Sequence, residues 1–244
     1  MLYNRNTFVR PDTKMSVLIF ENPSILLLLE HFGLDLLVKS KNAEQLCADN
    51  QIDSDLFITI ANLYNGFKVA ENKPKLNTRV LENVLTFLKN SHTFYLKDKI
   101  PEIGLMIEKM YNHHRLEEVK LIETFFADYA KEVREHLEYE DGIVFPYVVS
   151  LIQTQSEKTP LQTSFSLAEY REHHTDIETK LTDLKNLLVK HIELKYNPAL
   201  KRKLLISLFE LENDLNIHSV IEERILMPLI QELEKKNTGW TNAQ

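Results

Sequence analysis

Two segments of the chain share a longer pattern that begins with a histidine and has a glutamate four residues later, among apolar residues that follow a helical period. The first copy is "HLEYEDGIVFPYV" from His136, and the second is "HSVIEERILMPLI" from His218. In both copies an acidic residue follows the glutamate and a proline stands ten steps after the histidine, so the copies are offset by 82 residues. His92 and His174 share this offset. The chain is therefore predicted to contain two copies of a helix pair around a pseudo-twofold axis.

Helical phase places both motifs on the apolar side of their helices, because residues three, four and seven positions apart share one helix face. The predicted core stripe through His136 and Glu140 comprises Ile122, Phe126, Tyr129, Val133, Ile143, Tyr147 and Leu151. The matching stripe through His218 and Glu222 comprises Leu204, Leu208, Leu211, Leu215, Ile225, Leu229 and Leu233. The histidines and glutamates of both motifs are therefore predicted to lie in the protein core.

A bound metal would explain why these polar residues are buried. An ionised carboxylate in an apolar core costs several kcal/mol unless another charge compensates it. Four histidines and two glutamates would give each of two ions two imidazoles, with both carboxylates free to bridge the ions. Cys47 is the single cysteine, which excludes a thiolate-rich site. Nitrogen and oxygen ligands with open positions favour non-haem iron, and zinc and manganese also accept them. The predicted metal ligands are His92, His136, Glu140, His174, His218 and Glu222.

A lone histidine on an apolar stripe is more often a packed core residue than a ligand. The common register of four histidines with two glutamates favours a metal site over a metal-free bundle. His173 competes with His174, but it breaks the 82-residue offset. His113 and His114 end a predicted helix, where they are expected to interact with the helix C-terminus, and one of them joining the site is the alternative.

Four further residues flank the two motifs. Asp141 and Glu223 each follow a candidate ligand glutamate directly, and each is either a partner of a ligand imidazole or a solvated acid. Pro146 and Pro228 fall inside the helical pattern and are expected to kink or end those helices.

The predicted fold class is all-α, with a small helical N-terminal domain before an antiparallel four-helix bundle. Helical periods, glycines at predicted helix ends and the polar segment "KVAENKPKLNT" indicate these boundaries. The predicted parts are the N-terminal domain 1–70, a linker 71–78, the bundle 79–236 and a C-terminal tail 237–244.

Charge and hydropathy limit the partners. The net charge is −7, and residues 1–70 contain six Lys or Arg against eight Asp or Glu, so a helix-turn-helix reading of that region matches DNA poorly. The most apolar run, "ILLLLEHFGLDLLV", is too short and too polar to span a bilayer, and the N-terminus lacks a signal-peptide pattern. We expect a cytoplasmic protein without membrane or nucleic-acid partners, and a homodimer is a candidate assembly state.

The segments "HTFYLKDKIPEI", "HLEYEDGIVFPYV", "EHHTDIETKL" and "HSVIEERILMPLI" together resemble the hemerythrin-like (HHE) domain of the Repair of Iron Centres (RIC) di-iron proteins. The resemblance covers about residues 79 to 236 and implies the same six ligands, with Glu140 and Glu222 as bridging carboxylates of an oxo-bridged di-iron centre. Ile177 and Glu178 stand where oxygen-carrying hemerythrins have a further histidine, which makes oxygen storage a weaker expectation.

The segment "NPSILLLLEHFGLDLL" is similar to the N-terminal domain of that family, but Leu37 and Val38 replace its Cys-Cys pair. The resemblance implies a stress-response protein that repairs damaged iron-sulfur proteins and binds nitric oxide or oxygen. A gas or redox sensor that signals through the N-terminal domain or a partner protein is the alternative. A ferritin-like oxidase is a weaker reading, because its usual Glu-x-x-His ligand order is reversed here.

Overall fold

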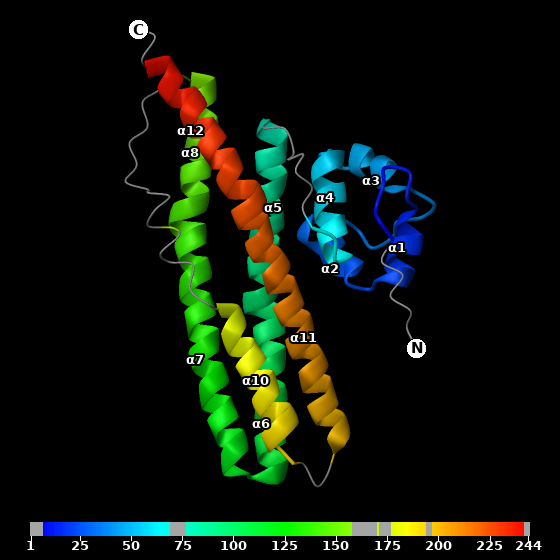
Figure 1. Cartoon of the computed structure of the whole chain (residues 1–244), viewed down its shortest axis with the longest axis vertical. Helices are drawn as coiled ribbons and strands as arrows, with labels where there is room; N and C mark the ends of the chain where they lie inside the picture. Colours follow the sequence, from blue (N-terminus) through cyan, green and yellow to red (C-terminus); the bar gives the residue numbers. More distant parts are fainter. Residues whose placement is uncertain (1–6, 69–76, 158–169, 171–176, 194–196, 242–244) are drawn as a thin grey trace. The chain divides into compact units, whose positions relative to one another are not determined.

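The computed structural model describes residues 7–68, 77–157, 170, 177–193 and 197–241, and every element in these ranges is helical (Figure 1). The strand-like pairing described in them is one isolated bridge between Lys14 and Asn42. The all-α prediction is confirmed. The elements are α1 (Met15–Glu21), α2 (Ile25–His31), α3 (Ala43–Asp49), α4 (Ser54–Tyr64), α5 (Thr78–Phe94), η1 (Tyr95–Lys99), α6 (Ile100–His114), α7 (Glu117–Tyr139), η2 (Glu140–Val144), α8 (Phe145–Glu157), α10 (Ile177–His191), α11 (Pro198–Ile221), η3 (Glu222–Leu226) and α12 (Met227–Thr241).

Contacts divide the chain into two compact units. The first comprises Met1–Ser91, Ser150–Leu161 and Ile217–Gln244, and the second comprises His92–Val149 and Gln162–Asn216. The predicted boundaries of the N-terminal domain, linker, bundle and tail are not tested by this division and stay a prediction.

Two of the four described short helices of the first unit, α2 and α4, end near the glycines that the sequence predicts. Gly33 after α2 and Gly66 after α4 have φ angles of 68° and 80°, a backbone region that glycine adopts without steric cost. Asn42 begins α3 with a capping box, because its side chain accepts from the Gln45 amide and the Gln45 side chain accepts from the Asn42 amide. Local residue choice therefore sets the lengths of these helices.

These short helices pack against α5 within the same unit. The Asn90 side chain donates a hydrogen bond of 2.9 Å to the His31 carbonyl, and the Asp53 amide donates one of 2.9 Å to the Asn83 side chain. The Phe87 ring lies edge-on to the buried His31 ring, with centroids 5.1 Å apart. Asn83, Phe87 and Asn90 share one face of α5, so this face holds the N-terminal helices.

In the second unit α6 and α7 form a hairpin, and Arg115 between them has a left-handed φ of 50°. Lys180 of α10 forms an ion pair with Glu132 of α7. Lys185 of α10 pairs with Glu212 of α11. A further contact, between η1 and α11, is described below. With these pairs, the segments α6 with η1, α7, α10 and α11 each contact the next one. The antiparallel four-helix bundle itself stays a prediction.

Within the described ranges, three π-helical turns interrupt the long helices. Their wide hydrogen bonds run from the Ile100 amide to the Tyr95 carbonyl, from Phe145 to Glu140 and from Met227 to Glu222. Each turn is followed by a proline at the second position after its end, namely Pro101, Pro146 and Pro228. Proline removes an amide donor and its ring clashes with the carbonyl four residues earlier, and a widened turn relieves that clash.

Pro146 and Pro228 were expected to kink or end their helices, and of these two outcomes the ending is wrong, because α8 and α12 continue past them. The π turn in η2 also corrects the predicted core. Ile143 was expected on the buried stripe, but its side chain is 46% exposed while Val144 is fully buried. The extra residue of the π turn shifts the helical phase, which a constant α-helical period does not anticipate. The other residues of the two predicted stripes are buried as expected.

Candidate metal centre

The two π turns η2 and η3 carry the two candidate ligand glutamates at their first positions. Glu140 begins η2 and Glu222 begins η3, so the 82-residue offset of the sequence is repeated in an unusual backbone conformation. Both side chains are fully buried. Single-turn π segments inside α-helices occur frequently at functional sites. The backbone therefore marks the same two positions that the sequence repeat selects.

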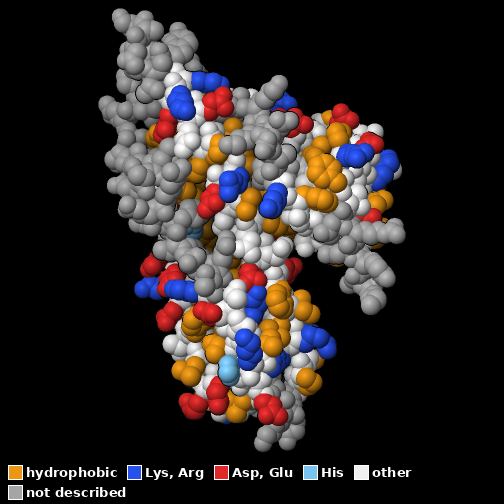
Figure 2. Space-filling model, in the orientation of Figure 1, with side chains coloured by type: hydrophobic (Ala, Val, Ile, Leu, Met, Phe, Trp, Pro, Cys, Tyr) orange, Lys and Arg blue, Asp and Glu red, His pale blue; other side chains and the backbone are white. Residues whose placement is uncertain are grey.

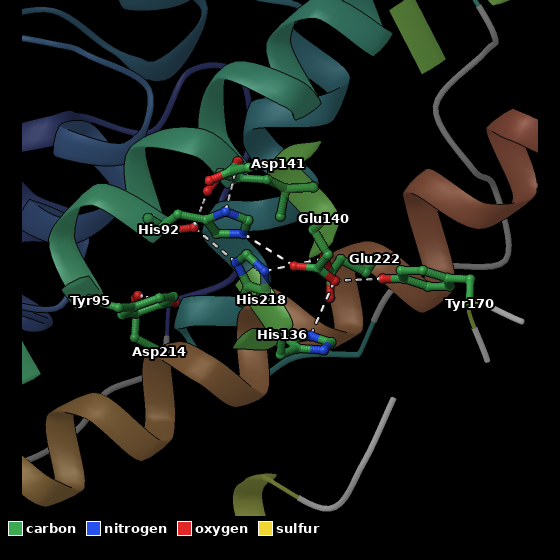
Figure 3. Close-up of polar contacts among 11 residues, drawn as sticks. His92, Tyr95, His136, Glu140, Asp141, Tyr170, Asp214, His218 and Glu222 are labelled. Atoms are coloured by element: carbon green, nitrogen blue, oxygen red, sulfur yellow. Dashed lines mark hydrogen bonds and ion pairs between the residues drawn. The ribbon is translucent and has the colours of Figure 1, made fainter. Parts of the chain in front are cut away.

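Glu140 lies between two histidines of the second unit. Its Oε2 is 3.3 Å from His92 Nε2, and its Oε1 is 3.2 Å from His136 Nε2 (Figure 3). A third contact comes from the Tyr170 hydroxyl, which donates to Glu140 Oε1 at 3.0 Å. Each carboxylate oxygen thus faces a different imidazole, which is the arrangement that a bridging carboxylate requires.

The other ring nitrogen of His92 contacts Asp141. His92 Nδ1 is 3.0 Å from Asp141 Oδ1, and the carboxylate accepts the Nδ1 proton. The His92 ring also stacks on Phe145, with centroids 5.3 Å apart. Asp141 is therefore a partner of a candidate ligand imidazole, one of the two roles the sequence left open. Its contact holds the Nε2 lone pair of His92 toward Glu140.

In the first unit, His218 Nε2 is 3.2 Å from Glu222 Oε1. The Nδ1 atom of the same ring is 2.8 Å from Ser91 Oγ. Ser91 has one hydroxyl proton, and it donates that proton to the Leu88 carbonyl at 2.7 Å. The hydroxyl must therefore accept from His218 Nδ1, which fixes the proton of a neutral His218 on Nδ1.

These hydrogen bonds point two imidazole lone pairs at carboxylate oxygens. In a neutral His92 or His218 with its proton on Nδ1, the Nε2 atom can only accept a hydrogen bond, and it faces a carboxylate oxygen that also accepts. A cation between these two atoms would interact favourably with both. The separations of 3.2 and 3.3 Å also exceed the usual 2.7–2.9 Å of charge-assisted hydrogen bonds. Two ligands each about 2.1 Å from one ion lie about 3.0 to 3.4 Å apart, depending on geometry. The measured separations fall in that range.

Ligand atoms of His92, Glu140, His218 and Glu222 all lie within 4.8 Å of one another, and the four side chains are buried. This group could hold a metal ion. Its nitrogen and oxygen donors suit iron, manganese or zinc, and donor type alone does not choose among them.

This group contains four of the six predicted ligands. His136 contacts Glu140 as described, with a side chain 10% exposed. His174 lies outside the described residues, as does its competitor His173. His113 and His114 are in the last turn of α6, as expected for residues at a helix C-terminus. The full six-ligand assignment therefore stays a prediction.

Ser91 and Tyr170 are site residues that the sequence reasoning missed. Ser91 directly precedes His92, but neither it nor Tyr170 belongs to a repeated motif. Glu223 is exposed, and Ser91 supplies the partner of His218 Nδ1. By the repeat, Glu223 corresponds to Asp141, whose partner His92 corresponds to His174. A contact of Glu223 with His174 is therefore a prediction, because His174 lies outside the described residues.

A second group of polar contacts lies along η1 and α11 in the second unit. The buried Tyr95 hydroxyl donates to Asp214 Oδ2 at 2.7 Å. Lys99 Nζ donates to Glu102 at 2.7 Å and to Glu210 at 2.6 Å. Burial by itself would lower the pKa of Lys99, but the two glutamates outweigh it and the pKa lies above its ordinary value. These contacts fix η1 beside α11, directly after the helix turn that carries His92.

Comparison of the chain with known protein families, curated proteins and solved structures finds no match. Among the described helices, none has the length and apolar character needed to cross a membrane.

Proposed function

We propose that this protein is a non-haem di-iron protein of the hemerythrin-like kind, acting in iron-sulfur cluster repair under nitrosative or oxidative stress. The observation that carries the proposal is the buried group of His92, Glu140, His218 and Glu222, in which each glutamate begins a π turn and faces an imidazole. The predicted set of six ligands, four histidines and two glutamates, differs from the carboxylate-rich set of ferritin-like proteins. It agrees with the resemblance of residues 79–236 to the HHE domain.

The helix contacts support the bundle that this proposal needs. In the second unit α6 packs with α7, α7 with α10, α10 with α11, and α11 with η1. Four helical segments that contact one another in a closed order are what a four-helix bundle provides. Bundle cores are a common location for metal sites built from side chains of facing helices.

The residues that would hold the metal are His92, His136, Glu140, His174, His218 and Glu222. When bound, a di-iron centre supplies a site for nitric oxide or oxygen and a store of releasable iron. The chain's own residues orient the ligands: Asp141 and Ser91 hold the two Nδ1 atoms, and the apolar core keeps water from the carboxylates. Damaged iron-sulfur proteins are the proposed recipients.

Metal analysis of protein purified without chelator tests the proposal. We expect about two iron ions per chain after anaerobic reconstitution, an absorption spectrum that changes with nitric oxide, and transfer of iron to a damaged cluster protein. His92→Ala and Glu222→Ala should lower iron content, whereas His113→Ala, at the C-terminal end of α6, should not. Iron content equal to wild type in both site variants would refute the ligand assignment. Failure to bind iron under reconstitution would refute the proposed function.

One contact favours the alternative, a gas or redox sensor that signals through the N-terminal helices. Asn90, Ser91 and His92 are consecutive on α5, and Asn90 contacts the His31 carbonyl while Ser91 contacts His218. A change at the site thus has a short covalent path to the N-terminal helices. Hydrogen exchange of α2 before and after nitric oxide addition tests this reading. A change in wild type that Asn90→Ala removes would support a sensor, and unchanged exchange would refute it.

The DNA-binding variant of the sensor has little support. On the face drawn in Figure 2, Lys and Arg side chains alternate with Asp and Glu side chains, and the described surface in that view shows no extended basic area. Binding to a phosphate backbone requires clustered positive charge.

A further inference from the structure

Tyr170 brings a phenol to the candidate metal centre. Its side chain is 1% exposed, and its hydroxyl lies 3.0 Å from Glu140 Oε1. The same oxygen is 3.2 Å from His136 Nε2. In Figure 3 the Tyr170 ring points its hydroxyl at the Glu140 carboxylate. Glu140 Oε1 therefore has two potential metal-ligand atoms beside it at similar distances, the His136 Nε2 nitrogen and the Tyr170 hydroxyl oxygen.

The internal repeat has no second phenol at the position equivalent to Tyr170. Position 170 corresponds to position 88 by the 82-residue offset, and position 88 is a fully buried leucine. The apolar side chain at the equivalent place shows that the fold does not require a hydroxyl there. Burying a hydroxyl is unfavourable unless it has a specific partner. Glu140 therefore has a potential additional ligand beside it, Tyr170, whereas the equivalent position in the other copy of the repeat is a leucine.

We infer that Tyr170 is an additional metal ligand, binding as a phenolate to the ion held by His136 and Glu140. The inference rests on the proposed function. The separations of 3.0 and 3.2 Å match those expected between neighbouring ligands of one ion, about 3.0 to 3.4 Å. On ligation the phenol O–H bond breaks, the metal–oxygen bond forms and the proton leaves to solvent, as metal binding generally requires.

An anionic oxygen is a hard donor, which favours iron(III) over iron(II). The ion beside Tyr170 and the ion beside Glu222 would then differ in the oxidation state they prefer. A centre built from two unequal ions retains one iron more firmly and releases the other more readily.

The visible absorption of the iron(III)-loaded protein tests the inference, because phenolate bound to iron(III) gives an intense charge-transfer band. Wild type, Tyr170→Phe and Tyr95→Phe are loaded with iron under the same conditions, and iron content is measured in each sample. Tyr95 is a matched control, since its buried hydroxyl also donates to a carboxylate, that of Asp214. Melting temperatures of the metal-free proteins show whether each variant folds.

We expect the band in wild type and Tyr95→Phe and its loss in Tyr170→Phe, with iron still bound. A wild-type protein that contains iron but lacks the band, or a band that survives Tyr170→Phe, overturns the assignment of Tyr170 and leaves the proposed function standing. Absence of bound iron in wild type overturns both. If Tyr170→Phe does not fold, resonance Raman spectra of wild type decide: phenolate modes support ligation, and their absence refutes it.

Discussion

Replacing Glu222 by glutamine should stabilise the metal-free protein while removing the stabilisation that metal provides. At the 4.8 Å separation that bounds the group, two ionised carboxylates repel each other by about 3.5 kcal/mol at an effective dielectric constant of about 20. The substitution removes this repulsion between Glu140 and Glu222. It also gives His218 Nε2 a donor, because the glutamine amide carries N–H groups where the carboxylate has none.

The gain is reduced by the lost interactions of the carboxylate, and a hydrogen bond to a charged group contributes about 1.5 to 3 kcal/mol. We therefore expect Glu222→Gln to raise the free energy of unfolding of the metal-free protein by about 0.5 to 2 kcal/mol. With metal at about 100 times its Kd, wild type should gain about 2.7 kcal/mol, and the variant should gain much less.

Urea unfolding at neutral pH, with and without chelator, measures both effects. Glu138→Gln is the matched control, since it makes the same chemical change on α7 at a position where the side chain is exposed. Its effect should stay within about 0.5 kcal/mol in either condition. If Glu222→Gln instead lowers the stability of the metal-free protein by 1 kcal/mol or more, about one lost hydrogen bond, then His218 is an imidazolium that pairs with the carboxylate. The reasoning that this site needs a cation would then be refuted.

Three further predictions concern Ser91, Cys47 and Lys99. Ser91→Ala should weaken metal affinity about 10- to 100-fold, measured by metal titration. It should also let the His218 proton move to Nε2, measured by nitrogen NMR of the metal-free protein. The control Ser207→Ala, which changes another buried serine, should have neither effect. Burial, with a smaller contribution from a nearby aspartate, raises the pKa of the Cys47 thiol to about 12, so the folded chain should resist alkylation at pH 8. Above pH about 9 the unfolded chain loses this proton and the folded chain keeps it, so stability should fall by up to about 1.4 kcal/mol per pH unit, a slope that Cys47→Ala lacks. Lys99→Met should cost about 1 to 2 kcal/mol in urea unfolding, less than a fully buried pair because both glutamate partners are 41% exposed.

Each of these three has an outcome that would contradict it. An unchanged His218 proton position in Ser91→Ala would show that the hydroxyl does not set the tautomer. Rapid alkylation of folded Cys47 would show that the thiol is accessible. A Lys99→Met protein as stable as wild type would show that the ion pairs compensate only for their own desolvation.

The sequence could predict the parts of the fold and site that depend on side-chain type at regular spacing. Apolar period located the long helices, and the shared offset selected His92, Glu140, His218 and Glu222 before any contact was known. A buried carboxylate needs compensation whatever the backbone does, so the metal hypothesis followed from residue type and phase alone.

What the sequence could not predict depends on small departures from that regularity. The π turn moves Ile143 to the surface, because one additional residue changes the phase of a helix by about 100°. Ser91 and Tyr170 have residues of other types at their equivalent positions in the repeat, His173 and Leu88, so the offset could not select them. The prolines two positions after the π turns were a usable signal, since proline inside a helical pattern demands a local adjustment of the backbone.

The π turns also affect the direction of side chains along a helix without ending that helix. A π turn holds a single inserted residue, and the α-helices on its two sides keep their alignment. Gly142 lies in η2 with no atom within 4 Å of where a Cβ would stand, so nothing packs on it. Deleting Gly142 should restore an uninterrupted α-helix from α7 into α8 and rotate the side chains of α8 by about 100° relative to His136 and Glu140. The residue inserted in η2 therefore sets how the pair of His136 and Glu140 is oriented relative to the apolar face of α8.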